Sequence, residues 1–268
     1  MTPVTGYLDS HLHLQAFTPR PDVDALLERT EKSDVRRMFC NATREDDWQP
    51  AIDLAAGNKE VIPFLGIHPW FAETAGPGWE QRLMSRLQQN PAGIGEIGLD
   101  RRCRADFSRQ QQIFLTQLQM ASELRRPVVI HCVKAWGTLL EILEPFAAEK
   151  RLPPAMIHSY GGSRETLRRL LKAGCFISYS CRIMADDRLQ PCFLETPLDQ
   201  LLLETDAPGQ SQKTAAIDTD KPSPECQEPA AIIRLYAWAA AKRGIEQQKL
   251  RQRIWSNGEI FADTILPR

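Results

Sequence analysis

The 268-residue sequence lacks the features that mark membrane proteins, secreted proteins and proteins that hold nucleic acid by charge alone. Lys and Arg number 33 against 34 Asp and Glu, which leaves a net charge of −1. Such a balance does not indicate binding of nucleic acid by a broad positively charged surface. Any contact with nucleic acid therefore has to be local, at a cleft or at the end of a nucleic-acid strand. The chain has no apolar stretch of the roughly 20 residues that a membrane span requires, and it does not open with a basic segment followed by an apolar run. We therefore expect a cytoplasmic protein that does not enter the membrane.

Cys-x-x-Cys pairs and a glycine-rich loop after a predicted strand are also missing. The seven cysteines are odd in number and form no Cys-x-x-Cys pair, so neither a disulfide framework nor a thiolate zinc site is indicated, and reduced cysteines are expected. No Gly-x-Gly-x-x-Gly follows an apolar run, which argues against a dinucleotide-binding sheet. The segment 93–98, Gly-Ile-Gly-Glu-Ile-Gly, has the spacing of that motif but lies within an apolar run instead of following one. It predicts instead a strand whose backbone closely approaches its neighbours.

The chain does contain an alternation of short apolar runs, rich in Val, Ile, Leu and Phe, with longer amphipathic stretches. The runs predicted as strands are Val4–Asp9, Val35–Cys40, Val61–Ile67, Gly93–Leu99, Val128–His131, Ala155–His158, Cys175–Tyr179 and Leu201–Thr205. The stretches predicted as helices are Pro21–Glu31, Glu45–Ala56, Trp79–Gln89, Asp106–Arg126, Ala135–Glu149, Arg164–Ala173, Arg188–Thr196, Glu228–Arg243 and Glu246–Asp263. Strands separated by helices indicate parallel β-α-β units.

Eight such units in a chain of this length predict an α/β fold, a TIM-like (β/α)8 barrel whose active site lies where the strands run into the following loops. An open doubly wound sheet is the main alternative. The last predicted helix comes in addition to the eight units, so the barrel should carry an extra C-terminal helix. We find no repeat or linker and expect a single domain over residues 1–268. The polar, Pro-containing segment Ala207–Cys226 has the length of a functional loop.

His11 and His13 are separated by one residue at the end of the first predicted strand. Alternate residues of an extended chain point the same way, so both imidazoles can reach one point while Leu12 faces away. This geometry suits two imidazoles on one divalent ion. An isolated His-x-His pair is more often two partly buried histidines that merely pack, so the rest of the chain has to decide between these interpretations.

All five histidines fall at or just beyond the C-terminal end of a predicted strand, and so do three carboxylates. The histidines are His11, His13, His68, His131 and His158, and the carboxylates are Glu96, Glu204 and Asp206. In a barrel these strand ends converge on one pocket. Their joint placement makes a metal site the leading hypothesis.

Each of these residues also has a structural explanation when it is taken singly. His131 and His158 are equally well explained as hydrogen-bonded residues at strand ends. Glu96 lies in an apolar strand, where an unpaired carboxylate is costly to bury, and a metal ligand explains it better than a buried ion pair. Asp206 has the alternative of starting a turn, and Glu204 that of a structural hydrogen-bonding group.

Five short motifs give the sequence a specific resemblance. They are Asp9-Ser10-His11-Leu12-His13, Gly66-Ile67-His68-Pro69, Ile94-Gly95-Glu96-Ile97-Gly98-Leu99-Asp100, Pro127-Val128-Val129-Ile130-His131 and Leu203-Glu204-Thr205-Asp206-Ala207-Pro208. In this combination and order they resemble the TatD family of metal-dependent deoxyribonucleases. The resemblance spans essentially the whole chain and extends to Glu228-Pro229-Ala230 and Asn257.

The resemblance implies a TIM-like barrel that holds two divalent ions. The ligands of one ion would be His11, His13, Glu96 and Asp206. Those of the other would be Glu96, His131 and His158, with Glu96 as the bridge, since a carboxylate can span metals ~4 Å apart. The mixed donor set suits Mg, Mn or Zn, and magnesium is favoured because family members are generally magnesium-supported.

The implied activity is that of a deoxyribonuclease of the 3′–5′ exonuclease type, which hydrolyses phosphodiester bonds. The expected partner is DNA, as single strands or 3′ ends, in repair or turnover, and the protein is expected to be a monomer. Bound water would become hydroxide near neutral pH, and both ions would stabilise the charge that develops on phosphate. Asp206 is the candidate proton acceptor and forms the catalytic pair with Glu96.

Positions that would contact the substrate depart from the family's pattern. Val133 stands two residues after His131, where the family commonly has arginine, and Lys134 is the candidate phosphate contact in its place. Arg101 and Arg102 follow Gly-Leu-Asp, where the family usually has tyrosine. Arg101 is expected to meet phosphate. For these cations, an exposed, solvated side chain is an equally good explanation.

Two further positions surround the expected pocket. His68 is expected to line it and to contact phosphate or a group behind the ligands. Trp70 stands where the family often has a second histidine; it either packs in its loop, which we favour, or stacks on a base. The basic segment that the family places before Glu-Pro is replaced by residues 221–227, Lys-Pro-Ser-Pro-Glu-Cys-Gln.

Two other hypotheses stay open at this point. An amidohydrolase-like enzyme for a small cyclic amide or phosphoester would use the same histidines and aspartate. Against it, the fourth strand offers Glu96 as the bridge and has no lysine that could be carbamylated. A catalytically weak accessory protein that keeps the pocket for structure would explain the altered substrate positions, but the complete ligand set argues against it.

Overall fold

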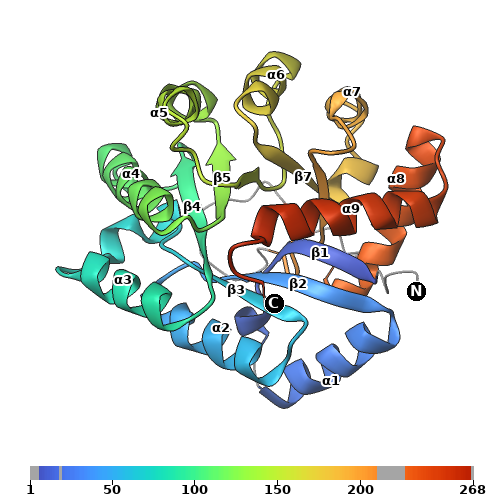
Figure 1. Cartoon of the computed structure of the whole chain (residues 1–268), viewed down its shortest axis with the longest axis horizontal. Coiled ribbons are helices and arrows are strands. Elements are labelled where there is room, and N and C mark those ends of the chain that lie inside the picture. The colour runs from blue at the N-terminus through green and yellow to red at the C-terminus, as the bar shows by residue number, and fades with distance from the viewer. Residues whose placement is uncertain (1–5, 18–19, 210–226, 267–268) are drawn as a thin grey trace.

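Eight parallel strands lie side by side in chain order in the computed structural model, which describes residues 6–17, 20–209 and 227–266 (Figure 1). The strands are β1 (Tyr7–Leu12), β2 (Val35–Asn41), β3 (Val61–Leu65), β4 (Gly93–Asp100), β5 (Val128–Val133), β6 (Ala155–Ile157), β7 (Phe176–Ser180) and β8 (Leu201–Glu204). All neighbouring pairs are parallel. The predicted TIM-like barrel is confirmed, and the open doubly wound sheet is excluded because the strand order never reverses.

A helix follows each strand, and one more comes at the end of the chain. The helices are α1 (Arg20–Lys32), α2 (Glu45–Gly57), α3 (Trp79–Gln89), α4 (Phe107–Leu124), α5 (Trp136–Ala148), α6 (Arg164–Lys172), α7 (Gln190–Glu195), α8 (Ile232–Arg243) and α9 (Gln247–Ala262). Short 3₁₀ helices occur at η1 (Leu14–Ala16), η2 (Pro69–Thr74), η3 (Cys181–Met184) and η4 (Pro229–Ala231). α9 is therefore the additional C-terminal helix that the sequence predicts.

Hydrogen bonds between β1 and the residues after β8 close the barrel. The Asp206 N–H donates to the carbonyl of His11 over 3.0 Å, and the His13 N–H donates to the carbonyl of Ala207 over 2.8 Å. The buried carboxylate of Asp9 accepts from both the backbone N–H and the hydroxyl of Thr205, over 2.9 and 2.5 Å. The first and last strands thus bring residues from opposite ends of the sequence together.

The first strand continues further than predicted. It ends at Leu12 instead of Asp9, so His11 lies within it and His13 directly follows it. The physical reason is burial, because Leu12 is fully buried and pairs with Cys40 of β2. The predicted start at Val4 and most of the predicted functional loop, residues 210–226, lie outside the described residues.

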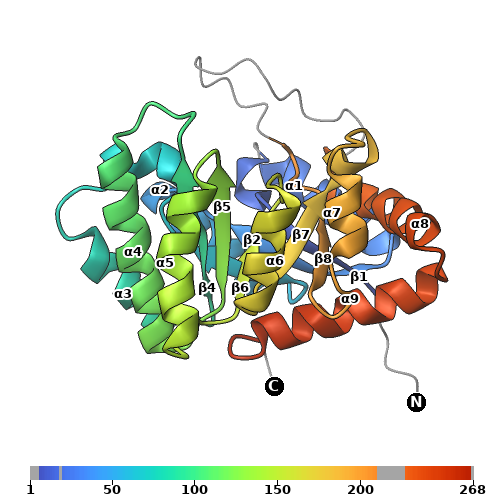
Figure 2. The same ribbon diagram turned by 90° about the horizontal axis from the view of Figure 1, so that it is seen from above.

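α9 crosses the end of the barrel at which the strands begin (Figures 1 and 2). The Phe261 ring lies 5.7 Å from that of Phe39, 5.9 Å from that of Phe64 and 5.8 Å from that of Phe176, between ring centroids. The Asn257 side-chain amide donates to the carbonyl of Leu201 at the start of β8 over 2.7 Å. Side chains therefore fill the barrel where the strands begin, which leaves the carboxyl ends of the strands as the location for a functional site.

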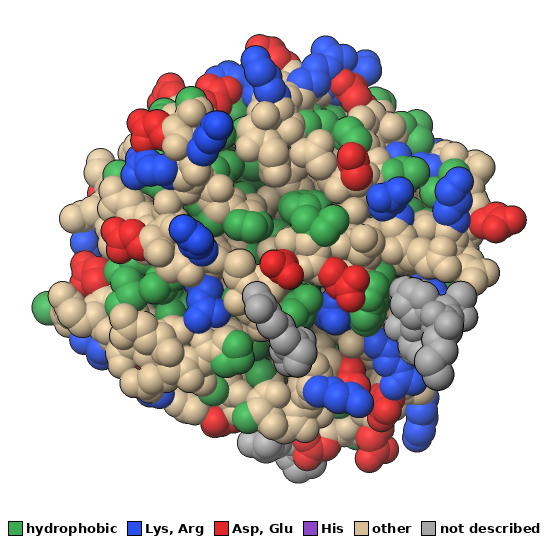
Figure 3. Space-filling model, in the orientation of Figure 1, with side chains coloured by type: hydrophobic (Ala, Val, Ile, Leu, Met, Phe, Trp, Pro, Cys, Tyr) green, Lys and Arg blue, Asp and Glu red, His purple; other side chains and the backbone are tan. Residues whose placement is uncertain are grey.

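The surface agrees with the balanced composition. On the face crossed by α9, Lys and Arg side chains alternate with Asp and Glu, and no histidine is visible (Figure 3). Among the described helices, none has both the length and the apolar character needed to cross a membrane.

The described cysteines depart from the expectation at one residue. The cysteines with free thiols are Cys40, Cys103, Cys132, Cys175 and Cys192. Cys181 is disulfide-bonded, so the expectation of reduced cysteines is wrong there. The remaining thiols lie in the packed interior or partly inside it, where they add apolar contacts.

Candidate metal centre

β1 directs His11 and His13 to one point, as the alternation of an extended chain predicts. Their Nε2 atoms lie 3.2 Å apart, and Leu12 between them is buried in the core. Nδ1 of His13 lies 2.7 Å from the backbone carbonyl of Asn41. Because a carbonyl only accepts hydrogen bonds, neutral His13 carries its proton on Nδ1 and presents the lone pair of Nε2 to the site.

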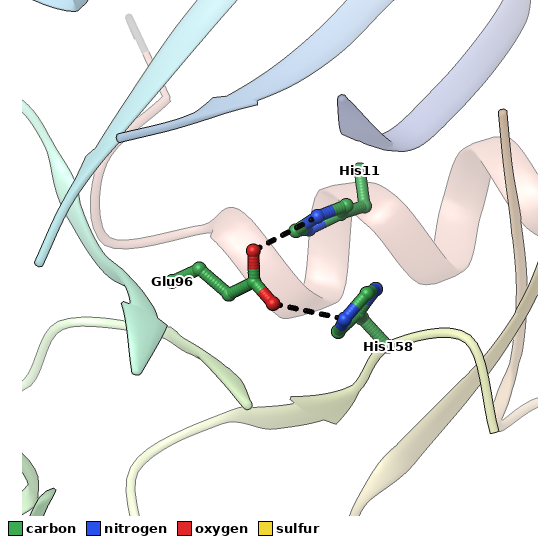
Figure 4. A group of neighbouring side chains, drawn as sticks. All are labelled: His11, Glu96 and His158. Atoms are coloured by element: carbon green, nitrogen blue, oxygen red, sulfur yellow. Dashed lines mark ion pairs between the residues drawn. The ribbon is translucent and has the colours of Figure 1, made fainter. Parts of the chain in front are cut away.

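Glu96 lies between two pairs of imidazoles. Figure 4 shows its carboxylate with one oxygen toward His11 and the other toward His158. Oε2 is 3.4 Å from Nε2 of His11 and 3.5 Å from Nε2 of His13. Oε1 is 3.0 Å from Nδ1 of His131 and 2.9 Å from Nε2 of His158. Each oxygen of this one side chain therefore serves a different pair of histidines.

Asp206 completes the group around the β1 histidines. Its Oδ1 is 3.6 Å from Nε2 of His11 and 3.5 Å from Nε2 of His13. The backbone of Asp206, just after β8, has a left-handed φ of 59°. The separations within this group run from 3.2 to 3.6 Å. Ligands at about 2.1 Å around a tetrahedral ion lie about 3.4 Å apart, so the spacing fits a metal shell.

His131 and His158 form the second group with Glu96, and a carboxylate holds each imidazole from behind. Nδ1 of His131 and Nε2 of His158 lie 3.2 Å apart. Nε2 of His131 is 3.3 Å from Oδ2 of Asp100, and Nδ1 of His158 is 3.1 Å from Oε1 of Glu204. Histidines that bind metals almost always donate their other N–H to such a partner, which fixes the proton and the ring.

His68 lies at the edge of the second group. Its Nε2 is 3.4 Å from Oε1 of Glu96, and its ring stands edge-on to that of His131. Its Nδ1 accepts the backbone N–H of Trp70 over 3.1 Å, so the neutral ring carries its proton on Nε2, which faces the site. The structure thus places His68 beside Glu96 and His131.

Several buried polar atoms of these groups have no hydrogen-bond partner among the described residues. They are Nδ1 of His11, Nε2 of His68, Oε1 of Glu96 and Oδ1 of Asp206. An unpaired buried polar atom costs about 1–3 kcal/mol, so a set of them needs a reason. The two carboxylate oxygens lie beside the imidazole nitrogens of the site, and such a mixed set of donors suits a divalent ion, whereas His68 presents Nε2–H and His11 faces the site with Nε2 instead of Nδ1. Sets drawn from these residues could hold a metal, and the donors fit that role.

Burial and mutual attraction set the charges in the cluster. Burial raises the pKa of Glu96, but the surrounding imidazoles, led by His158, hold it well below its usual range. Burial lowers the pKa of His13, yet the hydrogen bond to Asp206 and the charge of Glu96 raise it to about 9. For His68 burial dominates and lowers the pKa to about 4. Glu96 is therefore ionised near pH 7, while His68 is neutral.

The two predicted phosphate contacts lie outside the buried cluster. Arg101 directly follows β4 and Lys134 directly follows β5, and both are exposed. The Arg101 guanidinium lies 3.8 Å from the ring centroid of Phe107. Both cations are therefore at the strand-end side of the barrel, but the structure does not join them to the histidines.

The sequence did not predict two supporting residues. Asp100 contacts His131, and its signal was available, because it lies four residues after Glu96 on the same face of a strand. The indole N–H of Trp70 donates to Oδ2 of Asp100 over 2.6 Å. The sequence suggests packing or base stacking for Trp70, and neither interpretation includes this hydrogen bond. Glu204 takes the structural hydrogen-bonding role that was one of its two alternatives.

Comparisons with known proteins agree with this architecture. The family model described as TatD related DNase matches residues 8–262. A relative from Salmonella typhimurium named "3'-5' ssDNA/RNA exonuclease TatD" is 28% identical over 251 residues, or 91% of this chain and 94% of the relative. The protein of the same name from Erwinia tasmaniensis is 30% identical over 257 residues, 91% of each chain.

A solved structure supports the same assignment. YJJV, a TatD homologue from Escherichia coli K12, matches with a TM-score of 0.83 at 25% identity, over 96% of this chain and 98% of that one. The family model covers nearly the whole barrel, including the strand-end histidines and carboxylates. This chain belongs to the family of TatD related DNases.

Proposed function

We propose that this protein is a two-metal exonuclease that removes nucleotides from the 3′ end of single-stranded DNA or RNA. The observation that carries the proposal is Glu96, whose two oxygens face two separate pairs of imidazoles. A pair of ions about 4 Å apart can stabilise both the attacking and the leaving oxygen of a phosphodiester. The substrate class follows the names of the TatD exonucleases that the chain resembles.

The proposed ligands divide into two sets that share Glu96. One set is His11, His13, Glu96 and Asp206, and the other is Glu96, His131 and His158. Mg²⁺ is the proposed ion, with Mn²⁺ and Zn²⁺ as alternatives that the same donors accept. When bound, such ions lower the pKa of a coordinated water and neutralise charge on phosphate.

Asp206 is the proposed proton acceptor. Its side chain is 19% exposed, whereas that of Glu96 is 2% exposed, so Asp206 is the carboxylate that water reaches. Its Oδ1 faces the β1 histidines, which leaves Oδ2 to take the proton. Glu96 contributes by holding both groups in register.

His68, Arg101 and Lys134 are the proposed substrate contacts. Nε2–H of His68 is unpaired, and burial keeps its ring neutral, so it can donate to a phosphate oxygen without adding charge. Arg101 and Lys134 lie on the loops after β4 and β5, where they can contact phosphates beside the cleaved one.

The net charge of the chain suits a substrate that is bound at its end. A net charge of −1 favours recognition of a strand end by a few groups over wrapping of a duplex. All proposed ligands come from one chain, so the site is complete in a monomer, which is the proposed assembly. We place the activity in the cytoplasm, where nucleic acid is turned over.

The test is cleavage of single-stranded DNA and RNA labelled at either end, with Mg²⁺, Mn²⁺ or Zn²⁺, next to a panel of cyclic amides and small phosphoesters. We expect metal-dependent shortening from the 3′ end that EDTA and Glu96→Ala abolish. Glu28→Ala, an exposed carboxylate on α1, is the matched control and should keep full activity. Turnover of a small molecule without cleavage of nucleic acid, or no turnover by metal-loaded protein, would overturn the proposal.

A further inference from the structure

Trp70 is linked through Asp100 to His131. The indole Nε1–H of Trp70 donates to Oδ2 of Asp100 over 2.6 Å, and the same oxygen lies 3.3 Å from Nε2 of His131. Trp70 lies in η2 after β3, Asp100 ends β4 and His131 lies in β5. The link therefore crosses three consecutive strand ends and reaches a residue of the second histidine group.

The rest of Asp100 is held by its own loop. Its Oδ1 accepts the backbone N–H of Arg102 over 2.7 Å. Its backbone N–H donates to Oε1 of Gln110 over 2.8 Å, and its carbonyl accepts from Nε2 of Gln110 over 3.1 Å. These contacts fix the backbone and one oxygen, while Oδ2 is left to Trp70 and His131.

The shared oxygen gives a proton on Nε2 of His131 an acceptor, 3.3 Å away. Nδ1 faces a second carboxylate oxygen, Oε1 of Glu96, 3.0 Å away, so either nitrogen of the metal-free ring can carry the proton. A proton on Nε2, held by Asp100, leaves the lone pair of Nδ1 free for a metal ion. The indole N–H of Trp70 donates to the same oxygen and so holds the Asp100 carboxylate in place for this contact.

We propose that Trp70 is a positioning residue for the second ion, acting through Asp100 to fix the ring and the proton of His131. This inference rests on the proposed two-metal function, since it names what sets the affinity of one of the two ions. Trp70 does not act by stacking on a base. Its indole nitrogen, not its ring face, carries the effect.

The chain provides an internal control for this role. The backbone N–H of Trp70 donates to Nδ1 of His68, and a side-chain substitution keeps that bond. Trp70→Phe therefore removes the link to His131 and retains both the link to His68 and an aromatic ring at the same place. Trp136→Phe on α5 is the matched control, because its ring packs on Tyr160 instead of a carboxylate that holds a histidine.

The first measurement is a calorimetric titration of metal-free protein with Mn²⁺. Residues that hydrogen-bond to a metal ligand typically contribute about 10–100-fold in metal affinity. Trp70→Phe should therefore weaken the binding of one of the two ions roughly tenfold and leave the binding of the other unchanged. Trp136→Phe should leave both unchanged. Asp100→Asn should weaken the binding of the same ion. Adding Trp70→Phe to it should have little further effect, because the two substitutions break the same link.

The second measurement does not depend on metal or activity. Nitrogen NMR of the metal-free protein, at a pH where the imidazoles are neutral, should show a larger share of the Nε2–H form of His131 in the wild type than in Trp70→Phe, with His68 unchanged. If the His131 signals change in this way but the protein binds no metal ion, the result would support the link and overturn the proposed function. The inference would be overturned in favour of base stacking if Trp70→Phe had the same His131 signals and metal affinities as the wild type while Trp70→Ala had a raised KM.

Discussion

Glu96 and Asp206 are carboxylates of one cluster, yet their surroundings give them different chemistry. Glu96 is enclosed by five imidazoles, and its side chain is 2% exposed. Asp206 contacts the two β1 histidines, and its side chain is 19% exposed. A buried, shared carboxylate holds ions in place, whereas a carboxylate at the rim can exchange a proton with water.

Asp206→Asn separates these roles. The asparagine oxygen can still coordinate a metal, but it cannot take a proton at neutral pH. We expect kcat to fall about 10²–10⁴-fold, the usual contribution of a general base, while two ions still bind. Single-turnover cleavage and metal content measure the two effects, with Asp24→Asn on the exposed face of α1 as the control. Full activity at unchanged metal content would refute the role of Asp206.

At the scale of elements, β4 and β5 approach unusually closely at the site. Gly98 has a φ of 143°, and a Cβ there would lie 2.0 Å from the backbone carbonyl oxygen of His131. Glycine is thus required both by its backbone conformation and by the neighbouring strand. This confirms the close backbone approach that the glycine spacing of residues 93–98 predicts.

Gly98→Ala should therefore destabilise the protein and disturb the second histidine group. Backbone strain and overpacking of this kind cost about 1–3 kcal/mol each, so we expect a loss of roughly 3 kcal/mol. Gly57→Ala is the control, because a Cβ at the end of α2 would meet no atom within 4 Å. Urea unfolding gives both values. A loss for Gly98→Ala no larger than that for Gly57→Ala would contradict the close approach.

α9 is the second element with a distinct role, since it packs against the end of the barrel opposite the site. Phe261→Ala removes a fully buried ring that contacts three other phenylalanines and should cost about 3–5 kcal/mol. Ile260→Ala on the same helix, 60% exposed, should cost far less. Metal affinity of the folded fraction should be unchanged in both variants. A weaker metal site in Phe261→Ala would show that the two ends are coupled.

The sequence predicted the elements better than it predicted the contacts between them. Strand and helix order follow from apolar runs and periodicity, and the placement of histidines at strand ends follows from the barrel. The link from Trp70 through Asp100 to His131 could not be predicted, because it depends on how η2 packs against the ends of β4 and β5. The end of β1 was misplaced for a related reason, since pairing of Leu12 with β2 extends the strand.

At the scale of the whole molecule, the fold brings the ionisable groups of the site close together. Burial lowers the pKa of His158, but Glu96 and Glu204 raise it well above its usual range. His13 is likewise raised to about 9 through Asp206 and Glu96, against burial. Protons on these imidazoles thus stabilise the metal-free cluster. Divalent ions compete with the same protons for the same nitrogens.

Between pH 6.5 and about 9, the metal-free protein should therefore lose stability while the stabilisation that Mg²⁺ adds should grow. The pKa of His13 rises from 6.5 to about 9 on folding, so its stabilising contribution is complete below pH 6.5 and is lost as the pH rises through 9. The same loss of protons frees ligands, so the rise in Tm that Mg²⁺ causes should grow over this range. Thermal unfolding with EDTA and with Mg²⁺ across the range measures both trends, and His13→Gln should flatten the EDTA series. A Mg²⁺-induced rise that shrinks with pH, or an EDTA series unaltered by His13→Gln, would show that protons and metal ions do not share this site.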